Sequence, residues 1–89
     1  MARLVHIIAA DGRVVHVDDV QHIRWYATRP PAPAGFRMAA VNRLGQSVGL
    51  EDVETGVQAE ELARQYGFTE LERNWNGTIR AWRPKGGAA

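Results

Sequence analysis

Two dipeptides, Asp11-Gly12 and Asn76-Gly77, each separate two runs in which apolar and polar residues alternate. Such a dipeptide between alternating runs is the strongest short-range signal for a β-hairpin, because both residue types tolerate the positive φ of a tight turn. The chain is therefore expected to carry an antiparallel strand pair near each end.

The first hairpin can be drawn with two loop lengths. A two-residue loop pairs Ile7 with His16, whereas a three-residue loop over 10–12 pairs Ile7 with Val15 and gathers the apolar residues on one face. Register follows the face that becomes buried, and glycine suits the last, left-handed position of a three-residue loop. We predict the three-residue loop, which also sets His6 opposite His16.

The second hairpin presents the same choice. A three-residue loop that begins at Trp75 sets Glu72 opposite Arg80, and opposite charges directly across a ladder are favourable. We predict this register, which puts Trp75 at the tip and turns Trp82 outward opposite Glu70.

The middle of the chain is less decided. β-Branched and aromatic residues favour a strand over 19–27, whereas Asp18 and Gln21 have the spacing of a helical capping pair. The Pro-rich segment 29–35 is a break. Residues 36–44 favour a second strand, with a short helix as the alternative.

One helix is clearly predicted, over 56–66. Thr55 is a good N-cap, and Gln58 completes the spacing of a capping box. Gly67 is suited to end the helix, which lets Phe68 fold back onto it. Four residues fall at helical spacing and form one apolar stripe, namely Ala59, Leu62, Ala63 and Tyr66.

These elements predict an α+β fold, a small two-layer domain in which an antiparallel sheet built from hairpins carries one main helix on one face. A chain of 89 residues has room for one core. We expect a single domain over 1–83 and a flexible C-terminal tail over 84–89, which is too small and polar to pack.

Composition limits the chemistry. The chain has no cysteine, and Ser47 is its only serine, so thiolate nucleophiles and disulfides are excluded and no nucleophile-elbow pattern is present. The glycines do not have the spacing of a phosphate-binding loop. We therefore expect no enzyme activity and no cofactor.

Three residues in and next to the first hairpin could form a metal site. In the predicted register His6, His16 and Asp18 share one face, and two imidazoles with a carboxylate can hold a divalent ion. Half-exposed strand histidines are the more common explanation, and we assign no metal site.

Charge is distributed in blocks along the chain. Residues 1–45 hold six arginines and three aspartates, a balance of +3; residues 46–72 hold seven acids and one arginine, a balance of −6; residues 73–89 hold four bases and no acid, a balance of +4. The sum is the net charge of +1. Such blocks suggest a molecule with an acidic face and a basic face.

The candidate site lies in the second hairpin, where cations and aromatics interleave. Its residues are Arg73, Trp75, Asn76, Arg80, Trp82 and Arg83. Tryptophan and arginine dominate protein-interface hot spots, and the same pair also serves nucleic-acid surfaces.

The expected function is a non-enzymatic binding module, a protein–protein interaction or inhibitor and accessory protein of phage or plasmid type. The alternative is a nucleic-acid-binding domain that uses the basic C-terminal hairpin, although a net charge of +1 is low for that class. No run approaches the ~20 apolar residues of a membrane helix, and the N-terminus lacks the flanks of a signal peptide. We expect a soluble, cytoplasmic protein that has a protein partner, with no membrane contact; a homodimer is compatible with the sequence.

Overall fold

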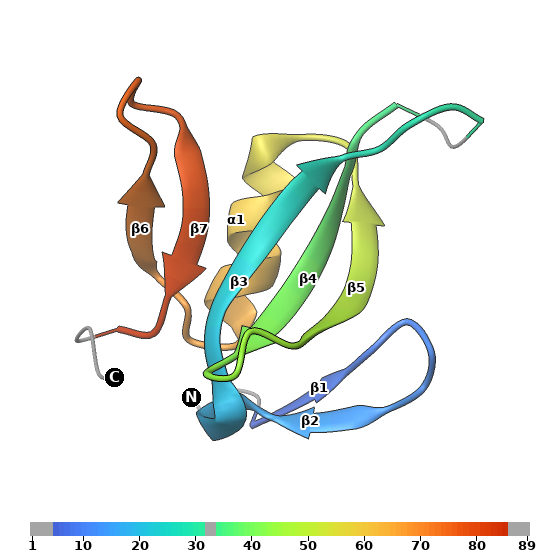
Figure 1. The fold of residues 1–89 in the computed structure, drawn as a ribbon, viewed down its shortest axis with the longest axis vertical. Helices are drawn as coiled ribbons and strands as arrows, with labels where there is room; N and C mark the ends of the chain where they lie inside the picture. The colour runs from blue at the N-terminus through green and yellow to red at the C-terminus, as the bar shows by residue number, and fades with distance from the viewer. Residues whose placement is uncertain (1–4, 32–33, 86–89) are drawn as a thin grey trace.

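The computed structural model describes residues 5–31 and 34–85. Seven strands, one 3₁₀ turn and one α-helix follow each other in the order β1 (His6–Ile8), β2 (Val14–His16), η1 (Val17–Asp19), β3 (Val20–Ala27), β4 (Phe36–Asn42), β5 (Ser47–Val53), α1 (Gly56–Gln65), β6 (Glu70–Arg73) and β7 (Ile79–Arg83) (Figure 1).

The main sheet has five strands in the order β5-β4-β3-β7-β6, and β1 and β2 form a separate two-stranded sheet. All registered neighbours are antiparallel. The helix α1 packs on one face of the main sheet, and in Figure 1 the sheet lies in front of it. The predicted α+β architecture of an antiparallel sheet with one helix on one face is confirmed.

The register of the first hairpin is confirmed. Ile7 lies opposite Val15, and His6 lies opposite His16. The loop over 10–12 is closed by the Ala9 amide, which donates to the Arg13 carbonyl at 2.8 Å. Glycine is required at the end of this loop, because Gly12 has a φ of +89° that side chains with a Cβ rarely adopt.

The second hairpin was predicted correctly at its tip and wrongly along its strands. A bulge between Glu72 and Arg73 makes Arg80 an extra residue, so Glu72 lies opposite Ala81 rather than Arg80. Trp82 consequently lies opposite Leu71 rather than Glu70, and its side chain is 0 % exposed. Burying an indole outweighs a surface charge pair, which contributes only about 0.2–1 kcal/mol.

Both undecided segments in the middle of the chain are strands, as favoured. Asp18 does not cap a helix; it lies in η1, where its amide donates to Nδ1 of His16 at 3.1 Å. The predicted break over 29–35 separates β3 from β4, and its residues 32–33 lie outside the described residues. Gly35 ends the break with a φ of +151°, at a place where a Cβ would lie 2.5 Å from the Val53 carbonyl oxygen.

The helix is confirmed with one residue fewer. Oγ1 of Thr55 accepts from the Gln58 amide at 3.3 Å, and the Gln58 side chain reaches back to the Glu54 amide at 2.7 Å. At the other end Gly67 has a φ of +84°. The Gly67 amide donates to the Arg64 carbonyl at 2.9 Å, and the Phe68 amide donates to the Ala63 carbonyl at 3.0 Å. These two bonds are those of a Schellman end, which places Phe68 in the core against the helix.

The core lies between α1, the main sheet and the first hairpin. Its largest fully buried side chains are Trp82, Phe68, Ile7, Ile23 and Met38. Trp25 lies at one side of this core, stacked on Phe36 with a centroid distance of 4.3 Å and edge-on to Trp82 at 5.3 Å.

The C-terminal segment leaves the sheet after Arg83. The Lys85 amide donates to the Gly67 carbonyl at 3.1 Å, and residues 86–89 of the predicted tail lie outside the described residues. Within the described part of the chain, no helix has the length and apolar character to span a membrane.

The N-cap can be tested by substitution. Thr55→Ala removes the acceptor of the Gln58 amide, so the free energy of unfolding should fall by about 0.5–2 kcal/mol. Chemical denaturation measures this loss, and Gln65→Ala, an exposed change at the other end of the helix, should have almost no effect. Equal losses in both variants would contradict the assigned helix start.

Candidate binding surface

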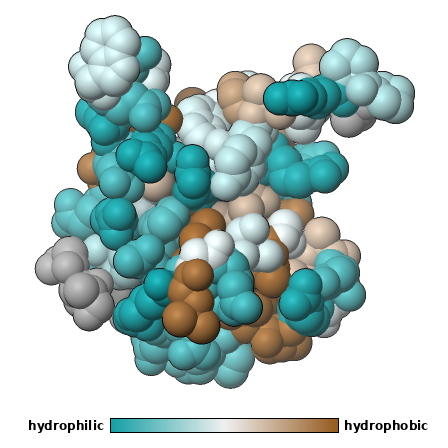
Figure 2. Space-filling view, in the orientation of Figure 1, coloured by the Kyte–Doolittle hydropathy of each residue, from teal (hydrophilic) through white to brown (hydrophobic). Residues whose placement is uncertain are grey.

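Trp75 is the most exposed large apolar residue described, with 98 % of its surface accessible. It lies in the turn between β6 and β7, at the end of a hairpin that protrudes at the upper left of Figures 1 and 2. A large apolar side chain in such a place gains nothing from the fold of a monomer.

The backbone of this tip is held by its own polar side chains. Oδ1 of Asn76 accepts from the Thr78 amide at 3.1 Å and from its hydroxyl at 2.7 Å. Nδ2 of Asn74 donates to the same hydroxyl oxygen at 3.0 Å, and Nη1 of Arg73 donates to the Gly77 carbonyl at 2.8 Å. Trp75 therefore extends from a turn that is already ordered.

The structure separates the six residues of the predicted site. Arg73, Trp75 and Asn76 lie together at the tip, and Arg80 is exposed on the bulge of β7. Arg83 lies further down the strand, where Nη2 pairs with Oε1 of Glu72 at 3.2 Å. Trp82 belongs to the core, so the prediction that it faces outward is wrong.

The Arg83 pair also shifts two titrating groups. Its hydrogen bond lowers the pKa of Glu72 below the ordinary 4.5. The neighbouring His22 is partly buried. Desolvation, as the larger cause, and then the charge of Arg83 lower the pKa of its imidazole below the ordinary 6.5. Nδ1 of His22 is buried and has no hydrogen-bond partner among the described residues.

A second cluster was missed in the sequence. On β3 the side chains of His22, Arg24 and Tyr26 alternate with the core residues Ile23 and Trp25, so they share the face that α1 does not cover. These polar residues occupy every second position of the strand, which is the sequence signal that they share one face. The prediction used only the apolar residues of this segment.

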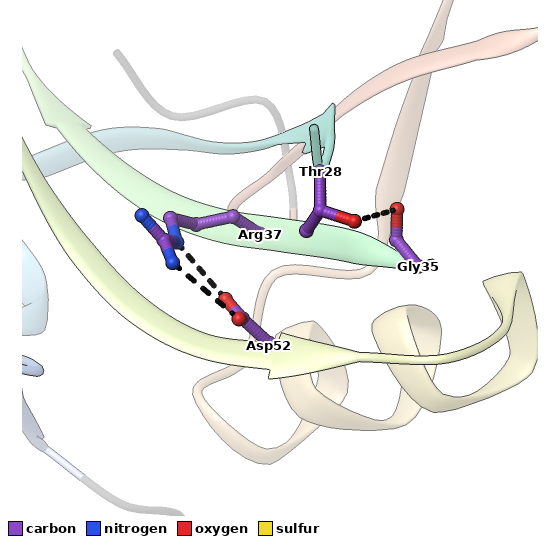
Figure 3. A network of polar contacts seen from close by, with 4 residues as sticks. All are labelled: Thr28, Gly35, Arg37 and Asp52. Carbon is purple, nitrogen blue, oxygen red and sulfur yellow. Dashed lines mark hydrogen bonds and ion pairs between the residues drawn. The ribbon is translucent and has the colours of Figure 1, made fainter. Parts of the chain in front are cut away.

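Tyr26 and Arg37 are direct cross-strand partners on this face. Nε of Arg37 lies 3.0 Å from Oδ1 of Asp52 on the adjacent strand (Figure 3), and this bond lowers the pKa of the Asp52 carboxyl. A hollow of about 420 Å³ lies beside the pair, lined by Tyr26, Ala27, Thr28, Arg29 and Arg37.

The histidine pair of the first hairpin was weighed as a metal site. The rings of His6 and His16 lie edge to face, 5.2 Å apart, and Nδ1 of His16 is already the acceptor of the Asp18 amide. Over residues 5–31 and 34–85, no three His, Cys, Asp or Glu side chains gather as a metal-binding group.

No protein-family model, curated protein or solved structure was found to match this chain.

The two tryptophans of the second hairpin should respond differently to truncation. Trp75→Ala should change the free energy of unfolding by less than about 1 kcal/mol, because the indole is exposed. Trp82→Ala should cost about 3–5 kcal/mol, because it empties a buried site. Urea denaturation of both variants measures the difference, and a large loss for Trp75→Ala would place that side chain in the core.

Acid should weaken the fold partly through His22. Between the lowered folded pKa and the ordinary value of 6.5, the unfolded chain binds more protons than the folded one. The free energy of unfolding should therefore fall as the pH drops through this window, and His22→Gln should reduce that fall. Denaturation curves at pH values from neutral to about 5 measure it, and an unchanged pH dependence in the variant would rule out His22 as the source.

Proposed function

We propose that this protein is a non-enzymatic binding module that inserts Trp75 into a pocket of a protein partner. The observation that carries the proposal is an indole 98 % exposed on a turn that its own hydrogen bonds hold in place. Tryptophan is enriched among the few residues that dominate binding energy. A turn ordered before binding also loses less conformational entropy when the complex forms.

Charge around the tip defines the partner further. Arg73 and Arg80 are exposed near Trp75, and the chain from 73 to 85 contains no acidic residue. An apolar pocket with an acidic rim would complement this tip, because complementary charge speeds encounter and sets orientation. A small domain with one protruding residue suits an inhibitor or accessory role, since filling a partner's pocket blocks it.

Nucleic acid is the second candidate for this hairpin, and the pairing of Arg83 makes it the weaker one. The guanidinium of Arg83 is paired with Glu72, so a carboxylate already meets its charge. One fewer cation is therefore available for phosphates along the hairpin than the sequence suggests.

The test places a photo-crosslinking amino acid at position 75 and, as a matched control, at position 57. Val57 is also an exposed apolar residue, but it lies on α1. In extracts of the native host, position 75 should give a discrete protein adduct that survives nuclease, and position 57 should not.

Affinity for the identified partner provides the decisive measurement. Trp75→Ala should weaken the complex by about 2 kcal/mol or more, as truncation of a hot spot does, whereas Val57→Ala should not. Loss of the adduct after nuclease would favour the nucleic-acid alternative, and unchanged affinity of Trp75→Ala for the partner would contradict the proposal.

A further inference from the structure

The face of the main sheet that α1 leaves uncovered carries several small residues. Gly49 of β5 lies opposite Ala39, Ala39 lies opposite Arg24, and Arg24 lies opposite Ala81 of β7. Residues that pair across strands share a face. Ala39 and Ala81 are buried, yet they lie outside the main core cluster, which is consistent with a place on this second face.

The guanidinium of Arg24 lies over the ring of Tyr26, two residues along the same strand, with Cζ 5.2 Å from the ring centroid. One face of the ring is therefore in contact with this cation, and the other face is left for a ligand. The Tyr26 side chain remains 45 % exposed. Tyr26 also lines the hollow of about 420 Å³, together with Arg37 and Arg29. Figure 2 views this face and shows mostly hydrophilic or intermediate colours over its middle.

Around Tyr26 the charge on this face is positive. Arg24, Arg29 and Arg37 stand near one acid, Asp52, which Arg37 engages (Figure 3). Further along the same face, Glu72 lies opposite Ala81 and Glu70 lies opposite Arg83, and Glu72 pairs with Arg83. Within residues 5–31 and 34–85, no ion pair between Arg24 or Arg29 and an acid is present. Two of the three guanidinium groups therefore keep their charge uncompensated by a carboxylate.

We infer that the face formed by Arg24, Tyr26, Arg29 and Arg37 binds single-stranded nucleic acid. An exposed ring offers a stacking surface to a base, and nearby arginines attract the phosphates that flank it. Open antiparallel sheets that present aromatic side chains bind single strands in this way.

The same features argue against a duplex. The bases of a double helix are stacked on one another inside it, so they cannot stack on the Tyr26 ring. A duplex would contact this face only through its phosphates, and the exposed ring would then contribute nothing. None of the four residues belongs to the Trp75 tip, so this surface is a second one and goes beyond the proposed protein contact.

The first measurement uses fluorescence anisotropy at low ionic strength. Labelled oligothymidylate and oligouridylate of about 15 nucleotides, within the range of single-strand site sizes, serve as probes and distinguish DNA from RNA. Tyr26→Ala should weaken binding about tenfold, the loss of one stacked base. Tyr26→Phe keeps the ring and should retain most of the affinity.

The second measurement tests the cations. The double variant Arg24→Gln with Arg29→Gln should flatten the slope of log affinity against log salt by about 1.4, since each phosphate contact on a single strand contributes about 0.7. Arg64→Gln removes the same kind of charge from α1 and is the matched control. Arg29→Gln alone, at an exposed position, serves if the double variant has a lowered melting temperature.

Four outcomes would overturn the inference. Three concern the face itself: a wild-type Kd weaker than about 100 µM, the limit of nonspecific binding; unchanged binding by Tyr26→Ala; and a salt slope that Arg64→Gln lowers as much as Arg29→Gln does. The fourth concerns the hairpin tip. Trp75→Ala should bind the oligonucleotides as the wild type does. Loss of binding in that variant alone would move the site to the hairpin tip, whereas failure of the protein contact at Trp75 leaves this face unaffected.

Discussion

The attachment of the second hairpin to the rest of the fold depends on two indoles, the buried Trp82 and the half-buried Trp25. Only two residue pairs register β3 with β7, and one of them contains Trp82. Nε1 of Trp25 donates to the Ile79 carbonyl at 3.0 Å across the same junction, and its ring lies edge-on to Trp82. A short ladder is thus supplemented by a side-chain hydrogen bond and by burial of the largest side chains, which fixes where the tip that carries Trp75 is presented.

The same cluster reaches the helix. A Cβ added at Gly56 would lie 3.4 Å from Cη2 of Trp25, so the first turn of α1 approaches the indole closely. Strand pairing, helix placement and the direction of the hairpin are therefore coupled through one aromatic group. A change at Trp25 would act on all three, because side chains in contact do not respond independently.

The sequence predicted correctly those elements that are determined by interactions between residues close together in the chain. The helix was found because Thr55 and Gly67 satisfy backbone groups within a few residues of themselves, and the first hairpin because only one register makes its apolar face continuous. The second hairpin was misaligned because the bulge at Arg80 has no signature in the adjacent residues. It arises from the distant packing of Trp82 against Trp25. Tyr26 and Arg37 were missed for a related reason, since their proximity exists only once β3 and β4 pair.

The two edges of the main sheet also shape how this protein meets other chains. At one edge, β6 is four residues long, carries Glu70, Glu72 and Arg73, and lies beside a bulge. Short length, charge and irregularity are the devices that keep an edge from recruiting a further strand. At the other edge, the Ala10 amide of the first hairpin donates a hydrogen bond to the Gly49 carbonyl of β5, which is therefore not available to another strand. Growth of the sheet into a neighbouring molecule is thereby discouraged on both sides, and recognition is left to side chains rather than to the backbone.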